Sequence, residues 1–376
     1  MNNSEKNFQR TLRSAAKTIA QPTIAIFFAL AAGAVAILLT GNSPISIYRA
    51  MLKGAFGGQY YLFATLARAT PVLICGLGAA IAWASNYMGI GGEGQMILGG
   101  FVSAIVGLYA PGPVWVRWTL AFAAAIAAGG VYSALSAWLL DRFKMSLAIS
   151  TLMMNYIAQY VMLHYTQNHF LDLSTDGKMV QTEMLPLEMR LPIIIKNYNL
   201  HAGFFLAILL VFAIWFLMYR TTFGFESRMS GFNIRFCEYG GVDSKKIMCR
   251  TLLLSGMICG FAGMIEVFGV QYRYVNGIFV SASYAWVGLN AALISGYNPI
   301  GILFTSIILA GIQTGGSLIA RSTNVPIEIS AIIQGCITLF ISARFLLKFR
   351  VPRRFRHRCR PNPAMETLKN PEGANT

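Results

Sequence analysis

Charge is scarce in this chain, and negative charge is scarcer still. Only 12% of its 376 residues are charged and 56% are hydrophobic, and the mean hydropathy is +0.56. A soluble domain carries about 25% charged residues, so this composition argues against a soluble globular protein. Lysine and arginine number 30 against 14 acidic residues, which gives a net charge of +16. A nucleic-acid-binding domain needs a charge-rich surface, so an apolar chain with a basic excess indicates an integral membrane protein instead.

Enzyme and metal motifs are also missing. The sequence has no G-x-x-x-x-G-K-[ST], no H-E-x-x-H and no G-x-S-x-G, which argues against a P-loop, a zinc protease site and a nucleophile elbow. The four histidines and six cysteines show no metal-ligand spacing. A membrane enzyme would need clustered titratable groups on an interfacial loop, and the polar stretch 166–199 shows no such pattern. We therefore expect no catalytic residue, metal or cofactor in this chain.

Long apolar runs are what the sequence does contain. They predict an all-α polytopic membrane protein with about ten transmembrane helices. The first run follows a cationic start and resembles a signal peptide, but nine more runs follow, so we expect an uncleaved span. The expected spans are 23–40, 61–83, 96–109, 114–140, 145–165, 201–219, 251–270, 280–297, 300–320 and 327–349. Together they form one transmembrane domain over 1–349, followed by a basic tail over 350–376.

The positive charges fall into three blocks. Residues 1–22, 220–250 and 344–360 carry net charges of +3, +3 and +8, which account for 14 of the 16. Even numbers of expected spans separate these blocks, so all three can face the cytoplasm, as the positive-inside rule requires. We expect a multi-pass protein of the bacterial plasma (inner) membrane with cytoplasmic N- and C-termini and an outer loop at 166–199. A juxtamembrane basic tail attracts anionic lipid, so we expect membrane lipids, and no nucleic acid, among its partners.

A glycine-rich segment interrupts the apolar sequence between the second and third spans. It predicts a broken helix near Gly89–Gln95, with Glu93 and Gln95 inside the break. Irregular backbone at membrane depth is tolerated only where it is buried in protein or lines a wet cavity. Two interpretations stay open. The break faces a translocation path, or it forms a re-entrant turn in which Glu93 binds loose backbone N–H groups.

Polar side chains within other spans raise the same question. Asn155 and Gln159 are four residues apart and therefore share one helix face. They face a pore, or they hydrogen-bond to a neighbouring helix, and Glu266 and Asn290 present the same alternatives. The candidate substrate-path residues are Glu93, Gln95, Asn155, Gln159 and Asn290.

The polar stretch 220–250 contains a short segment with glycines on both sides. Gly231 precedes it, and Gly240 and Gly241 follow it. We expect Asn233 to cap a helix of about two turns and Gly240 to end it in a left-handed conformation. A short helix with defined ends favours a docking element, whereas a solvated connector would not need glycines at both ends.

Four stretches in the same order resemble the permease subunits of ABC importers of the branched-chain amino acid, ribose and nucleoside group. They are residues 86–95, 152–157, 221–242 and 284–302, within a resemblance that spans about residues 60 to 345. The last stretch, which contains Gly288 to Gly301, follows the family's pattern closely. The stretch 152–157 and the long outer loop are most similar to the nucleoside and simple-sugar branch.

This resemblance implies an ATP-driven importer in which the chain forms the translocation path for a nucleoside or a simple sugar. It implies a second permease subunit, like or unlike, and a periplasmic or lipid-anchored solute-binding protein. A cytoplasmic ABC ATPase subunit would bind the ATP and grip the segment 232–239 as a coupling helix. The residues assigned to ATPase coupling are Arg228, Gly231, Asn233, Arg235, Glu238, Tyr239 and Gly240. The alternative is an ion-coupled secondary transporter that uses Glu93 or Glu266.

Overall fold

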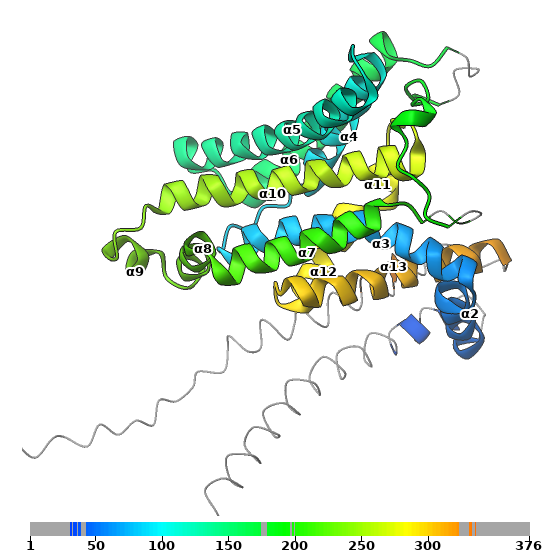
Figure 1. Cartoon of the computed structure of the whole chain (residues 1–376). Helices are drawn as coiled ribbons and strands as arrows, with labels where there is room; N and C mark the ends of the chain where they lie inside the picture. Colours follow the sequence, from blue (N-terminus) through cyan, green and yellow to red (C-terminus); the bar gives the residue numbers. More distant parts are fainter. Residues whose placement is uncertain are drawn as a thin grey trace, which may run out of the picture.

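Figure 1 shows the computed structural model of the chain. It describes residues 43–173, 179–195, 198 and 200–322, with isolated positions between 31 and 38 and between 331 and 335. Every regular element in these ranges is a helix, and the β pairings there are two isolated bridges. The helices are α2 (Pro44–Phe56), α3 (Gln59–Ala84), α4 (Gly92–Tyr109), α5 (Val114–Phe143), α6 (Leu147–His169), a 3-10 turn (Leu187–Met189), α7 (Gly203–Arg220), α8 (Thr222–Phe232), α9 (Ile234–Tyr239), α10 (Ser244–Glu266), a π turn (Val267–Gln271), α11 (Ile278–Ala282), α12 (Tyr284–Ser295) and α13 (Pro299–Ser322).

Six helical segments are long and apolar enough to cross a membrane. They are Gln59–Ala84, Val114–Phe143, Gly203–Arg220, Ser244–Gln271, Ile278–Ser295 and Pro299–Ala320. The expected spans 96–109 and 145–165 are helical, as α4 and α6, but are not among the six. The expected spans 23–40 and 327–349 lie outside the described ranges, apart from a few helical positions. The all-α class is therefore confirmed for the described part, and the total of about ten spans stays a prediction.

Two helical features differ from the expected pattern. α2 lies where no helix was expected, and Pro44 is in its first turn, where a missing N–H costs nothing. The expected span 280–297 is split into α11 and α12, because Ser283 has a left-handed φ of 54° between them.

α10 lies in the middle of the bundle, with α5 on one side and α3 on the other (Figure 1). Of its apolar stretch, 78% is buried, against 28% for α7. A Cβ on Gly256 would lie 2.3 Å from the backbone oxygen of Gly129, and one on Gly260 would lie 2.4 Å from that of Ala125. The G-x-x-x-G spacing therefore lets α10 and α5 pack backbone to backbone.

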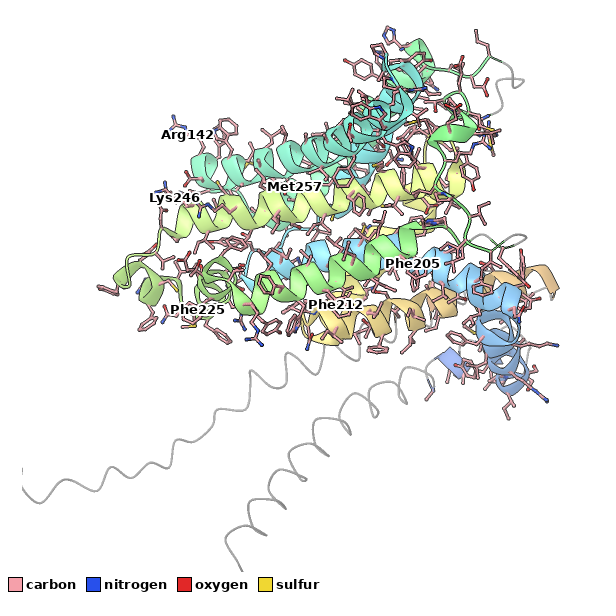
Figure 2. The ribbon with its side chains drawn as sticks, viewed as in Figure 1. Arg142, Phe205, Phe212, Phe225, Lys246 and Met257 are labelled. Carbon is pink, nitrogen blue, oxygen red and sulfur yellow. The ribbon has the colours of Figure 1, made fainter. Side chains whose placement is uncertain are left out.

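α7 lies at the outside of this arrangement. Figure 2 labels Phe205 and Phe212 on it, and these side chains are 59% and 58% exposed. A helix that is apolar yet exposed is suited to contact with lipid chains.

The connecting segments gather at two ends of the bundle. α8 and α9 lie at one end, called the α9 end, and Figure 2 places Arg142 and Lys246 there. α2 and α11 lie at the opposite end, called the α11 end. At the α9 end, Asp141 of α5 pairs with Lys245 at the start of α10, at 3.0 Å. The connection 141–144 thus lies at the same end as 220–250, which the charge pattern assigns to the cytoplasmic side.

Candidate functional site

The break between α3 and α4 lies earlier in the chain than the sequence predicts. α3 ends at Ala84 and α4 begins at Gly92, so Gly92 to Gln95 form the first turn of a helix and the irregular part is confined to residues 85–91. Asn86 turns the chain with a φ of 64°. Backbone groups in such a segment need hydrogen-bond partners inside the protein.

Side chains of α6 supply three of these partners. Asn155 Oδ1 accepts the N–H of Gly94 at 2.9 Å, and Asn155 Nδ2 donates to the carbonyl of Ile90 at 2.8 Å. Thr151 Oγ1 accepts the N–H of Ile90 at 2.9 Å. The Trp83 indole donates to the carbonyl of Gly89 at 2.9 Å. Asn155 therefore bonds to a neighbouring element, which is one of the two alternatives for this residue.

Thr151 was missed by the sequence reasoning. It lies one turn before Asn155 on the same face of α6, and this spacing is the signal that could have identified it. Both side chains hold the break in one shape.

Glu93 and Gln95 face a small cavity beside the break. Glu93 Oε2 accepts the indole N–H of Trp286 on α12 at 2.7 Å and, within the described part, no backbone N–H. The re-entrant-turn interpretation expected Glu93 to bind loose backbone N–H groups of the break. Side chains of α6 bind such groups instead. Gln95 Oε1 is buried without a hydrogen-bond partner. The cavity volume is about 30 Å³, which is room for one or two water molecules.

Two other candidate path residues lie away from this cavity. Gln159 is half-buried further along α6, and Asn290 is half-buried on α12. Neither lines the cavity beside the break. The structure therefore brings Glu93, Gln95 and Asn155 together and leaves Gln159 and Asn290 apart from them.

The second candidate site is the short helix α9. Its six residues begin after Asn233, whose Oδ1 accepts the N–H of Phe236 at 3.2 Å, so the expected cap is present. The expected left-handed end at Gly240 is wrong: Gly240 has a φ of −79°, and Gly241, at 82°, makes the turn.

Gly231 also has a different place from the one expected. It precedes α9, as expected, but it lies inside α8 and not in the connection between the two helices. A Cβ there would lie 2.2 Å from the backbone oxygen of Ala84, so this glycine allows α8 to touch the end of α3. The neighbouring side chains of Ser227 and Ser85 share a hydrogen bond. α8 is thereby packed directly on the break.

The surface of α9 is unusually aromatic. Tyr239 is 93% exposed, Phe232 86% and Phe236 63%, and Arg235 is exposed beside them. Glu238 accepts a hydrogen bond from the hydroxyl of Ser244 at 2.6 Å, which ties the end of α9 to the start of α10.

Arg228 has an internal role in this geometry. Its Nε donates to the carbonyl of Gly224 at 3.2 Å, and its guanidinium lies 4.6 Å from the ring centre of Tyr219. Gly224 lies on α8 itself, and Tyr219 lies on α7, so the contact with Tyr219 holds α8 against α7. Arg228 is therefore a tie between helices rather than an exposed docking group.

α10 begins with a charged cap next to α9. Asp243 accepts the backbone N–H groups of Lys245 and Lys246 at 3.1 and 3.2 Å. The backbone N–H of Lys246 and then its ammonium group hold the pKa of the Asp243 carboxyl below its ordinary value. This cap fixes where α10 starts and hence where α9 ends.

Metal binding finds no support in the described residues, among which no three His, Cys, Asp or Glu side chains are grouped to hold an ion.

Comparisons with known proteins agree with this arrangement. The family described as "Branched-chain amino acid transport system / permease component" matches residues 61–342. The chain is 34% identical to the guanosine ABC transporter permease protein NupP of Bacillus subtilis, over 87% of this chain and 94% of that protein. It is 26% identical to the nucleoside ABC transporter permease protein NupB of Lactococcus lactis, over 88% and 93% of the two chains.

A third relative is the glucose ABC transporter permease protein TsgB13 of Haloferax volcanii, with 25% identity over 92% of this chain and 93% of that protein. The family match covers most of the chain, and the guanosine permease is similar over almost its full length. The chain therefore belongs to the family of branched-chain amino acid transport system permease components, and it is a permease subunit of an ABC importer.

Proposed function

We propose that this chain is the permease of a nucleoside importer and that a separate cytoplasmic ATPase drives it by gripping α9. The observation that carries the proposal is α9 itself, a capped helix at the end of the bundle whose aromatic side chains are exposed. The guanosine and nucleoside permeases among the relatives support the substrate class. The family implies an ATPase and a binding protein as partners in general. A simple sugar is the second choice, supported by the glucose permease.

The exposed face of α9 fits a protein partner better than water. Phe232 at the end of α8 and Phe236 and Tyr239 of α9 are large and exposed, and exposed apolar side chains gathered in one region mark interaction sites. The longer stretch 220–250 around α9 has a net charge of +3, and Arg142 and Lys246 lie at the same end of the bundle. By the positive-inside rule we assign this end to the cytoplasm, and we propose the same side for both termini.

Few contacts separate α9 from the proposed translocation path, so a movement of α9 can be transmitted to it. α9 continues from α8, which touches the end of α3 through Gly231 and Ser227. Tyr87, inside the break, donates to the carbonyl of Ser244 at 3.3 Å. These packed contacts connect the ATPase end with Glu93 and Gln95, which we place on the path. Asn155 positions the break, and Gln159 and Asn290 stay predictions.

Removal of the α9 aromatic surface tests the coupling. In cells that depend on this chain for guanosine uptake, Tyr239→Ala combined with Phe236→Ala should lower the uptake rate at least tenfold, because the ATPase loses its grip. The amount of chain in the membrane should stay unchanged, as measured by immunoblot. Tyr109→Ala, an exposed tyrosine on α4, is the matched control and should retain uptake. Normal uptake by the α9 double variant would contradict the proposal.

A further inference from the structure

A second and larger cavity lies between α3, α10, α12 and α13, toward the α11 end. Its volume is about 400 Å³, within the range of about 300 to 1,000 Å³ found for small-molecule pockets. The cavity beside Glu93, at about 30 Å³, is too small for such a ligand. Arg68 of α3 and Glu266 of α10 both line the larger space, which we call the outer cavity.

Glu266 is held in place with one oxygen free. The residue is 1% exposed, and its Oε1 accepts the Tyr284 hydroxyl and the Gln271 amide, each at 3.1 Å. α10 changes to a π turn directly after Glu266, and the i to i+5 repeat of that turn brings Gln271 back over the carboxylate. Glu266 Oε2 is buried without a hydrogen-bond partner. A buried, unpaired acceptor is costly unless a ligand supplies a donor.

Arg68 supplies donors in the same space. Its Nε donates to Gln313 Oε1 at 3.0 Å, which orients the guanidinium, while its terminal nitrogens have no hydrogen bond in the described part. Arg68 and Glu266 form no ion pair within 4.0 Å there, although both line the cavity. The outer cavity therefore offers a separate donor and acceptor with opposite charges, which suits a ligand of zero net charge.

The walls of the outer cavity are suited to a flat ring. Tyr60, Tyr61 and Tyr284 line it together with smaller residues, of which Thr314 and Ser317 are polar. Aromatic side chains stack on the faces of all nucleobases because each base has a π face.

We propose that the outer cavity holds the base of a nucleoside during import. Glu266 Oε2 accepts an N–H on the base edge, Arg68 donates to the adjacent carbonyl, and the tyrosine rings cover the base face. Guanine, with N1–H next to O6, presents such an edge. This site rests on the proposed function, since it assumes that the importer carries nucleosides, and it adds which residues read the base.

Base selectivity tests the site. The natural chain is replaced in cells by the Glu266→Gln, Arg68→Gln or Tyr284→Phe variant. Uptake of radiolabelled guanosine and adenosine is then measured at concentrations below KM. Adenine presents an acceptor at N1 and a donor at N6, the reverse of guanine. The ratio of guanosine to adenosine uptake should therefore fall fivefold or more in the first two variants. A ratio does not depend on how much chain reaches the membrane. Glu188→Gln and Arg49→Gln are matched controls, because both residues are exposed and neither lines the cavity.

The other outcomes distinguish a wrong assignment of the outer cavity from a wrong proposed function. An unchanged ratio, or an equal loss of both nucleosides, would overturn the assignment of the outer cavity while nucleoside import stands. If deletion of the chain leaves nucleoside uptake intact, the proposed function itself fails. If deletion abolishes uptake of leucine instead, the cavity binds a zwitterionic amino acid, with its carboxylate at Arg68 and its ammonium at Glu266, and the base site is wrong.

Discussion

His201, just before α7, illustrates how a single buried side chain makes the protein sensitive to pH. The residue is 0% exposed, and its Nδ1 accepts the N–H of Gly203 at 3.1 Å. A Cβ on Gly203 or Gly269 would lie 2.6 or 2.7 Å from the ring, so the two glycines make room for it. Burial lowers the pKa of His201 from 6.5 to about 4, and the imidazole stays neutral in the folded chain.

This lowered pKa sets the sign of a pH dependence. Below about pH 6.5 the unfolded chain binds a proton at His201 that the folded chain does not bind. The free energy of unfolding should therefore fall as the pH drops toward 4, by up to about 3 kcal/mol. Above pH 6.5 the full stability is present. His201→Asn keeps an acceptor for Gly203 and should flatten this loss. Unfolding midpoints of the purified chain in detergent between pH 7.5 and 4 measure it. An equally steep decline in the Asn variant would show that other groups cause it.

At the scale of elements, the close crossing of α5 and α10 determines how the centre of the bundle packs. Gly260→Ala would place a Cβ 2.4 Å from the backbone oxygen of Ala125, so the helices would have to separate. Overpacking of this kind costs about 1 to 3 kcal/mol, and we expect a lower unfolding temperature. Gly58→Ala is the matched control, because its nearest neighbour is 3.7 Å from the added Cβ and its change should stay within about 0.5 kcal/mol. Equal midpoints for both variants would rule out a special role for this crossing.

At the scale of the whole molecule, features that depend on neighbouring residues in the sequence could be predicted. Features that depend on contacts between different helices could not. Asn233 and the glycines around it identified α9, because helix caps are local signals. The apolar runs identified the main helices for the same reason. The position of Arg68 beside the same cavity as Glu266 was not predictable in this way, because Arg68 lies on another helix and packing alone brings it there. The roles of Gly231 and Thr151 depend likewise on which helix lies next to them.

The central claim is that ATP hydrolysis at the α9 end moves a nucleoside through this chain. The most direct measurement is guanosine accumulation in proteoliposomes that contain the complete transporter with its ATPase and binding protein. We predict accumulation only when ATP is present on the side of α9, and none from the purified chain under a proton or sodium gradient. Accumulation driven by an ion gradient through the chain alone, without the ATPase, would contradict the account.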